Sequence, residues 1–388
     1  MKNGCELRYD GLENSTFVSQ KAVVREIWST SWGTGGKNCE ETYPVLISCL
    51  VPPGTRSPAW VSFVDKECRG NGAFLRVLTP SSTPVKNNFV ICVKSLHFTN
   101  LNPKTFLEWT EINHRLGADK IVVYTSDPEQ ERAIPESRIL DRKRFETPPE
   151  VNCSQRNFED STWHRRKLEI IAYNDCFYRY LNRTKFVIPL DVDEIIVPKT
   201  GNGWIDAFRV SFPTGSDAFA PDNFASFSVR NAYFFSDYPE TAIFRGFKLP
   251  FLRDRNVPVK LVNSLARRKN GQSGGSGSGS PFSRTLRSYR LSPRSDSVKS
   301  FVQVSKTLSV FNHFTFHVLD DAVGRQYILP ETTFQLNHYR NSCDPVLIEG
   351  CDEFLSQVTY DDSLERFRTS GNGQVISHNE TVRSQFLR

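Results

Sequence analysis

Two acidic residues, Asp191 and Asp193, lie within an apolar run that covers residues 186–198. Side chains alternate along an extended strand, so both carboxylates are predicted to lie on one face, with Val192 on the other. Two hard oxygen ligands where a strand opens into a crevice suit Mg²⁺ or Mn²⁺ carrying a diphosphate. An Asp-x-Asp pattern arises about once by chance in a chain of this length, so the surrounding elements must decide its meaning.

The composition is that of a globular protein with about two domains, on a prior of roughly 150 residues per domain. Of the 388 residues, 38% are hydrophobic and 12% are aromatic, which excludes a disordered chain. The net charge of +6 is modest. It slightly favours anionic small ligands or a membrane-proximal placement, and it gives no indication of a nucleic-acid partner.

Much of the positive charge belongs to one basic patch in the last third of the chain. We interpret this patch as a solvated loop, with contact to a phosphate or an acidic glycan as the alternative. Its members are Arg267, Arg268, Lys269, Arg284, Arg287, Arg290 and Arg294.

The cysteines predict a secreted or lumenal protein with several disulfides and one or more buried free thiols. No Cys-x-x-Cys pair is present, which argues against a zinc or redox site. Cys92 and Cys176 are interpreted as core residues, whereas Cys343 and Cys351 are close enough in sequence to bridge a short loop. The nine cysteines are Cys5, Cys39, Cys49, Cys68, Cys92, Cys153, Cys176, Cys343 and Cys351.

Glycosylation sequons at Asn14, Asn152, Asn182 and Asn379 permit a secretory location. No apolar stretch approaches the roughly 20 residues of a membrane span, and residues 1–10 do not resemble a signal peptide. If the protein is lumenal, we expect its targeting or anchoring segment to be absent from this chain.

Residues 1–88 are predicted to form a small β-rich domain. Short strands are expected near residues 17–18, 44–47, 60–64 and 74–78, separated by Gly, Pro and Ser turns. This all-β pattern favours a small sandwich.

The sequence pattern changes at residue 89. Residues 89–93 are continuously apolar, which predicts a strand that is buried on both faces. Asn102 and Pro103 then predict the start of a helix, and Gly117 predicts its end. A strand over residues 121–124, a helix over about 163–181 and the Asp191 strand follow. The alternation predicts an α/β domain with a mostly parallel sheet and helices on both faces. Pro189 predicts a local kink just before Asp191.

The catalytic domain is predicted over residues 89–345, with a flexible Gly/Ser loop at 270–282 and a C-terminal tail at 346–388. The loop separates the core of the domain from a final segment of strands and loops at residues 300–340.

Taken in order, these segments resemble glycosyltransferase family 92, whose animal and plant members transfer galactose from UDP-galactose. The metal-binding signature of the family is similar to LDVDEIIVP at residues 190–198. The other similar segments are residues 92–97, 107–117, 174–179, 299–300 and 338–340. The resemblance implies a GT-A nucleotide-sugar-binding fold, a divalent metal (usually Mn²⁺, or Mg²⁺), inversion at the anomeric carbon and a β-galactoside product.

The matched positions suggest roles for individual residues. Asp191 is expected to contact the ribose or the metal, Asp193 to bind the metal, and His338, in a C-terminal loop, to be a third metal ligand. Glu194 either orients its neighbours or is a surface carboxylate. The candidates for binding the uridine nucleotide are Lys94, Asp127, Lys299 and Arg340.

An inverting transfer also needs a carboxylate that accepts the proton of the attacking hydroxyl group. We choose Asp222 as this catalytic base, with Asp320 and Asp321 as rivals. His313 and His317 fall on one face of a strand predicted over residues 311–317, and we interpret them as packing residues in preference to metal ligands.

The resemblance implies an acceptor that is galactose or fucose on an N-glycan, through a β-1,4 linkage, or a pectic galactan. We choose the N-glycan, because the cysteine-bearing front domain suits an animal-type glycoprotein acceptor. The expected location is the Golgi lumen, as a type II membrane protein. One alternative is a non-catalytic glycan-binding protein that retains the fold. Another is a haloacid-dehalogenase-like phosphatase, although that motif has Thr or Val where Ile195 stands, and it lies close to the start of its domain.

Overall fold

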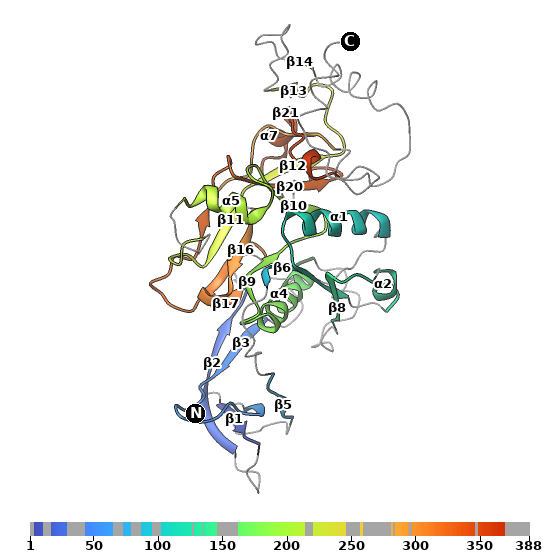
Figure 1. The fold of residues 1–388 in the computed structure, drawn as a ribbon. Helices are drawn as coiled ribbons and strands as arrows, with labels where there is room; N and C mark the ends of the chain where they lie inside the picture. The colour runs from blue at the N-terminus through green and yellow to red at the C-terminus, as the bar shows by residue number, and fades with distance from the viewer. Residues whose placement is uncertain are drawn as a thin grey trace.

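The computed structural model describes residues 4–10, 17–28, 43–64, 73–78, 87–94, 102–125, 128–134, 136–145, 162–213, 220–245, 257–258, 281, 284–294, 297–345 and 348–368. The predicted loop at 270–282 lies outside the described residues, apart from Pro281. Figure 1 shows the N-terminal strands at one end of the molecule and the C-terminal elements at the other.

The N-terminal region forms one antiparallel sheet with the strand order β3-β2-β1-β4-β5. A disulfide joins Cys5 in β1 to Cys49 in β3. The sandwich predicted for this region is not seen, because the described residues form a single sheet. The strands are β1 Gly4–Arg8, β2 Phe17–Glu26, β3 Val45–Cys49, β4 Trp60–Val64 and β5 Leu75–Arg76.

The central sheet has seven strands in the order β19-β11-β16-β9-β6-β7-β8. The half formed by β9, β6, β7 and β8 is parallel, as predicted. The strand β16 is antiparallel to both of its neighbours, β9 and β11, so the sheet is mixed. The other neighbouring strands of the sheet pair in parallel, so this sheet is mostly parallel, as predicted. The bounds are β6 Asn87–Val93, β7 Lys120–Thr125, β8 Leu140–Arg144, β9 Thr184–Pro189, β11 Ser226–Val229, β16 Lys299–Gln303 and β19 Tyr327–Ile328.

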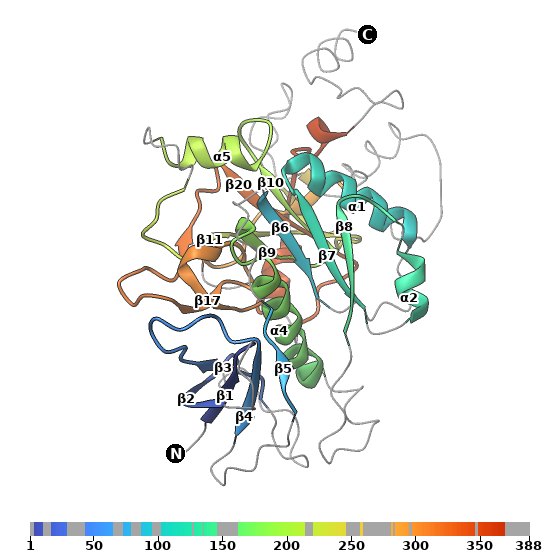
Figure 2. The same cartoon turned by 60° about the horizontal axis from the view of Figure 1, so that its bottom comes forward.

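Helices cover both faces of this sheet, as predicted. Helix α1, Pro103–Leu116, begins where the Asn102 side chain accepts a hydrogen bond from the Lys104 backbone N–H, and it ends at Gly117, whose φ of 130° favours glycine. Alternate residues of β6 face opposite sides: Phe89 packs on the side of α1, and Val90 packs on the side of helix α4, Thr162–Arg179. Figure 2 shows β6, β7 and β8 side by side between these helices. The short helix α2, Pro128–Ala133, follows β7.

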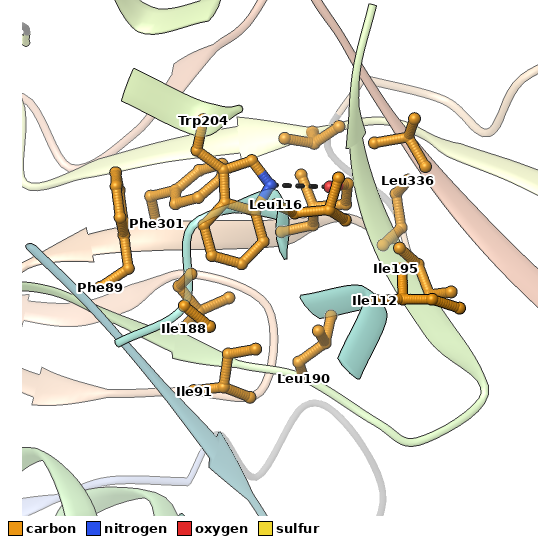
Figure 3. Close-up of a cluster of buried hydrophobic side chains, with 14 of the residues drawn as sticks. Phe89, Ile91, Ile112, Leu116, Ile188, Leu190, Ile195, Trp204, Phe301 and Leu336 are labelled. Atoms are coloured by element: carbon orange, nitrogen blue, oxygen red, sulfur yellow. Dashed lines mark hydrogen bonds between the residues drawn. The ribbon is translucent and has the colours of Figure 1, made fainter. Parts of the chain in front are cut away.

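The core on the side of α1 is dominated by aromatic rings. Trp204, the first residue of helix α5, Trp204–Ser211, lies against Phe89 and Phe301 with ring centroids 5.3 and 5.4 Å apart. Its indole N–H donates a hydrogen bond to the Ile196 carbonyl, so the buried polar atom has a partner (Figure 3). This packing fixes the strand that leaves the Asp-x-Asp segment against the central sheet.

The chain leaves the central sheet after β9 and enters a second sheet. The strand β9 ends at Pro189, which confirms a break in the strand before Asp191. After a turn, β10, Glu194–Pro198, joins a sheet with the order β10-β20-β12, in which β20 covers Phe334–Arg340 and β12 covers Asn231–Phe235. Asp191 and Asp193 therefore lie in a turn between two sheets. The alternation of side chains had predicted that both lie within one strand, and this prediction is wrong.

The C-terminal region is folded beyond residue 345, which corrects the predicted tail. Leu364 and Phe367 pack into the main core, and β21, Gln357–Tyr360, joins a sheet with the order β14-β13-β21-β15. The remaining elements are β13 Ile243–Phe244, β14 Val257–Pro258, β15 Leu286–Ser288, η3 Val304–Lys306, β17 Thr307–Val310, β18 Thr315–Val318, α7 Cys351–Ser356 and η4 Glu365–Phe367. The strand predicted over residues 311–317 is confirmed only for residues 315–317, which belong to β18, and residues 311–314 form a bend before it.

Two further disulfides join described residues. Cys343 and Cys351 are bonded, as predicted. Cys92 in β6 and Cys176 in α4 are fully buried, which confirms their interpretation as core residues, but they also form a disulfide that the sequence did not predict. The packing of α4 on β6 brings the two sulfur atoms together. Among the described residues, none of the helices combines the length and apolar character that crossing a membrane requires.

The Cys92–Cys176 disulfide should contribute more stability than the Cys343–Cys351 disulfide. The bonded residues are 84 positions apart in the first pair and 8 in the second. Loop-closure entropy then predicts losses of about 4.5 and about 2.5 kcal/mol when each pair is replaced by alanine. Urea denaturation of the two double variants measures both losses, and an equal or reversed order would contradict the assignment of α4 as the element that this disulfide anchors.

Candidate active site

The Asp-x-Asp segment is a β-turn closed by a hydrogen bond from the Glu194 backbone N–H to the Asp191 carbonyl, 3.0 Å long. The Glu194 side chain folds back, and its Oε2 accepts a hydrogen bond from the Asp191 backbone N–H, also 3.0 Å long. From outside the turn, the Trp109 indole in α1 donates to the Glu194 carbonyl, and the Tyr339 backbone N–H in β20 donates to the Asp193 carbonyl, each at 2.8 Å. Elements far apart in sequence thus hold the turn in place.

Lys299, the first residue of β16, lies directly beneath this turn. Its side chain is 1% exposed, and its Nζ lies 3.1 Å from Asp191 Oδ2, 3.2 Å from Glu194 Oε2 and 2.6 Å from Asn312 Oδ1. These three acceptors match the three N–H donors of an ammonium group. The prediction that Lys299 contacts a phosphate is not tested by this geometry, but its ammonium already has a full set of partners.

The other oxygen of Asp191 faces a second cation. Lys94, which follows β6, lies 3.4 Å from Asp191 Oδ1 and 2.9 Å from Glu169 Oε2 in α4. The Tyr173 hydroxyl, also in α4, lies 3.3 Å from the same Asp191 oxygen and 3.1 Å from Asn312 Oδ1. Lys94 is therefore part of the same charge network as Lys299, and its predicted contact with the uridine phosphates stays a prediction.

The two acidic groups beside Lys299 respond differently to burial. Burial opposes the ionisation of Asp191, but the ammonium groups of Lys299 and Lys94 outweigh it and hold the pKa of Asp191 well below its usual range. Burial is also the largest influence on Glu194, and it raises the pKa of that carboxyl despite the opposing charge of Lys299, with the negative charge of Asp191 adding to the rise. The side chain of Glu194 is 4% exposed, so the alternative of a surface carboxylate is wrong.

Asp193 is the exposed member of the pair. Its side chain is 46% exposed, and its Oδ2 lies 3.3 Å from Nε2 of His338. His338 lies in β20, opposite Glu194 of β10, which corrects its predicted place in a C-terminal loop. Burial disfavours the charges of both groups, yet their mutual attraction lowers the pKa of Asp193 and raises the pKa of His338. The structure thus brings together Asp191, Asp193 and His338, as the sequence predicted.

Asp193 and His338 offer a carboxylate oxygen and an imidazole nitrogen, a donor set that suits Mn²⁺. His338 Nδ1 lies 2.9 Å from the Asn231 amide, whose oxygen is buried without a hydrogen-bond partner among the described residues. Rotating the Asn231 amide by 180° exchanges its oxygen and nitrogen within the same space. The oxygen would then accept a hydrogen bond from the Nδ1–H of His338, which would leave Nε2 of His338 free to bind a cation. The described residues contain no ready group of three His, Cys, Asp or Glu ligands, so a bound diphosphate would have to complete the coordination.

Arginines lie beside Asp193 on β20 and near β15. The positive charge of Arg340 acts on Asp193, and its half-buried side chain ends β20 next to His338. Arg284 donates hydrogen bonds to the Arg340 carbonyl at 3.0 Å and to Asn341 Oδ1 at 3.3 Å. Burial lowers the pKa of Arg284, while the charge of Asp193 opposes this shift. The prediction that Arg340 binds the nucleotide stays a prediction.

Where the structure describes it, the basic patch is solvated only in part, since Arg290 and Arg294 are exposed whereas Arg284 and Arg287 are half-buried. Arg284 is half-buried beside the site, Arg287 donates to Asp361 Oδ2 at 2.8 Å, and Arg290 pairs with Glu353. The members Arg267, Arg268 and Lys269 lie outside the described residues.

The residues chosen as catalytic base are not brought to the site. Asp222 accepts a hydrogen bond from Gln303, the last residue of β16, whereas Lys299 is the first, and the two ends of this strand are about 13 Å apart. Asp320 and Asp321 belong to the loop whose Gly324 pairs with Phe224, at that same distant end. The structure therefore places these three residues away from the Asp-x-Asp turn, and the identity of the base is not tested. Asp127 lies outside the described residues.

The two other histidines pack, as predicted. His313 donates from Nδ1 to the Val298 carbonyl, and His317 donates from Nε2 to the Glu26 carbonyl, each at 2.8 Å. Four residues around the Asp-x-Asp turn and His338 were not predicted from the sequence: Glu169, Tyr173, Asn231 and Asn312. Only Tyr173 carried a signal, since it immediately precedes the segment 174–179 that carried the resemblance.

Asp193, His338 and Arg340 lie together where two sheets meet, and this arrangement of charges suits an anionic ligand that binds with a cation. Comparison with known proteins agrees. A family model for glycosyltransferase family 92 matches residues 87–368, more than two thirds of the chain. The chain therefore belongs to glycosyltransferase family 92, and it is a glycosyltransferase.

One curated relative extends this comparison. The chain is 26% identical over 139 residues to the beta-1,4-galactosyltransferase galt-1 of Caenorhabditis elegans. The match covers 35% of this chain and 31% of the relative, so it spans about a third of the length of each protein.

Acid should destabilise the fold through His313. Burial, with the charge of Lys299 adding to it, lowers the pKa of His313 to about 3, whereas an unfolded histidine titrates near about 6.5. A lowered pKa contributes stability above the unfolded value, and this contribution is lost as the pH falls from about 6.5 toward 3, by up to about 1.4 kcal/mol per pH unit.

His313→Gln keeps an N–H donor and cannot titrate. The free energy of unfolding, measured by urea denaturation between about pH 6.5 and pH 4, should depend less on pH in this variant than in the wild type. His317→Gln is the matched control. An equal flattening in the control would mean that the effect does not come from the buried site of His313.

Proposed function

We propose that the protein transfers galactose from UDP-galactose to a glycan acceptor, with inversion and with help from a divalent cation, Mn²⁺ or Mg²⁺. The single observation that carries this proposal is the exposed Asp193 carboxylate beside His338, at the turn where β9 leaves the central sheet of a family 92 chain. The parallel half of that sheet, with helices on both faces, is consistent with a GT-A nucleotide-sugar-binding fold.

Asp193 and His338 would hold the cation, which supplies positive charge to the departing diphosphate. Asn231 would fix the ring of His338 through Nδ1. Arg340, beside Asp193, would meet phosphate oxygens on the same side. Asp191, tied to Lys94 and Lys299, would hold the turn that presents Asp193. These roles are spread over β6, β10, β12, β16 and β20, so the site depends on the two sheets being joined correctly.

The acceptor is proposed to be galactose or fucose on an N-glycan, joined through a β-1,4 linkage. The name of the Caenorhabditis elegans relative supports galactosyl transfer and this linkage. Disulfides among the described residues suit an oxidising compartment, which supports the Golgi lumen. Anchoring as a type II membrane protein is part of the proposed location.

A donor screen tests the proposal directly. Purified protein is incubated with a panel of UDP-sugars, with Mn²⁺ or with a chelator, and released UDP is measured with and without N-glycan acceptors. UDP-galactose should give the highest rate, and the chelator should abolish it. A higher rate with another sugar would refute the donor assignment, and a rate that the chelator leaves unchanged would refute the role of the cation.

Asp193→Ala should reduce UDP release from UDP-galactose by at least about a hundredfold, because it removes the exposed carboxylate proposed to hold the cation. Asp206→Ala is the control for a general effect of losing a carboxylate, since Asp206 belongs to α5 and accepts a hydrogen bond from the Asn202 backbone N–H. The melting temperature of Asp193→Ala should stay close to that of the wild type. Retained activity would show that Asp193 does not hold the cation.

Asp222→Ala separates the structural reading of this residue from the sequence-based choice of catalytic base. Asp222 is exposed and lies beside Gln303, at the end of β16 remote from Lys299. The variant should therefore retain the turnover number and the KM for UDP-galactose within about twofold. A loss of about a hundredfold or more in turnover number, with the fold intact by circular dichroism, would restore Asp222 as the base.

A further inference from the structure

Lys299 is the most deeply buried cation of the site. An ammonium group with 1% exposure has lost its hydration and needs a protein partner for each N–H. Asp191, Glu194 and Asn312 supply these partners within 3.2 Å. No donor of Lys299 remains for a phosphate, and reaching a ligand would require it to abandon two buried carboxylates. The phosphate contact predicted from the sequence would need a rearrangement of these partners.

The consequences for Asp191 are specific. Its Oδ2 is held by Lys299, while its Oδ1 lies near Lys94 and the Tyr173 hydroxyl. Its side chain is 20% exposed, against 46% for Asp193. The cations of the network therefore lie on the Asp191 side of the turn, and the open carboxylate lies on the other side.

Lys299 also bridges the two ends of the turn. Asp191 begins the turn and Glu194 ends it, and both carboxylates touch the same ammonium group. Glu194 in addition accepts a hydrogen bond from the Asp191 backbone N–H. Without the cation, the two negative charges would repel each other within this closed loop, and the loop would open.

From these contacts we infer that Lys299 is a positioning residue: it locks Asp191 and Glu194 into the turn between β9 and β10, so that Asp193 alone of the Asp-x-Asp pair meets the cation of the donor. This inference rests on the proposed function for the identity of the donor. Lys299 acts through the turn and does not touch the substrate.

The test uses the purified full chain and four variants: Lys299→Met, Glu194→Gln, the double variant with both changes, and Asn312→Ala. The binding of Mn²⁺ in the presence of UDP is measured from the signal of free Mn²⁺ in electron paramagnetic resonance. Lys299→Met should weaken this binding about 10- to 100-fold, the range seen when a supporting partner of a metal ligand is lost. The double variant should recover most of the loss, because it removes the carboxylate that has no cation.

The rescue distinguishes positioning from direct phosphate binding. If Lys299 held the diphosphate, removing the charge of Glu194 could not replace it, and the double variant would bind Mn²⁺ and UDP as weakly as Lys299→Met. That result, or wild-type binding by Lys299→Met, would overturn the inference. Asn312→Ala keeps every charge and removes one acceptor from Lys299 and from the Tyr173 hydroxyl, so it should weaken binding by less than Lys299→Met. It serves in place of Lys299→Met should that protein fail to fold, and unchanged binding in it would also contradict the inference.

Lys167→Met is the matched control for the loss of a buried lysine, since its ammonium lies 4.2 Å from the centre of the Tyr43 ring and is not part of the turn. Melting temperatures of the four variants without metal or UDP form a second readout, in which the double variant should melt higher than Lys299→Met. If the wild type releases UDP from none of the UDP-sugars but this rescue in melting temperature persists, the proposed function fails while the role of Lys299 in the turn stands. If the wild type releases UDP from UDP-galactose but the double variant melts no higher than Lys299→Met, the proposed function stands and the role of Lys299 in the turn fails.

Discussion

The attraction between the Lys299 ammonium and the carboxylates of Asp191 and Glu194 is the interaction on which the site depends. Burial raises the free energy of each charge, and a tight turn keeps the two carboxylates close together. A cation between them is required for both to stay ionised. The antiparallel direction of β16 supplies it, because Val302 pairs with Val187 and the first residue of β16 therefore reaches the end of β9. A parallel strand would have placed Lys299 at the opposite edge of the sheet.

The same turn joins two sheets, and several elements share the task of holding it. The strand β9 makes its last contact through the Leu190 backbone N–H, which donates to the Cys92 carbonyl. Cys92 is also bonded to Cys176, and Tyr173 lies one helical turn before Cys176 in α4. The disulfide therefore fixes the helix that carries Tyr173 against the strand that leads to Lys94. Stability in this region and the geometry of the site are not separable.

The sequence predicted the elements whose signals are local. Asn102 and Gly117 mark the ends of α1 because capping depends on neighbouring backbone groups. The direction of β16 could not be predicted from the sequence. Every residue of this strand is buried, so the alternation of polar and apolar residues carries no information about its pairing. The place of Asp222 could not be predicted for a related reason: a carboxylate just before a strand looks the same at either end of a sheet. The partners of the turn, such as Asn312, come from distant segments, and only the tertiary fold assembles them.

Placing the Asp-x-Asp pair in a turn makes its two carboxylates unequal, which a continuous strand would not do. Lys94 and Lys299 are the two ammonium groups in contact with Asp191, Glu194 and Glu169. Asp193 contacts neither lysine: His338 lies 3.3 Å from it, and Arg340 and Arg284 interact with its charge. Three carboxylates thus share two lysines, and Asp193 is the exposed carboxylate. The proposed divalent cation, with the diphosphate that it would carry, would therefore bind at Asp193. The charge balance of the buried side therefore determines where on the turn a donor would bind.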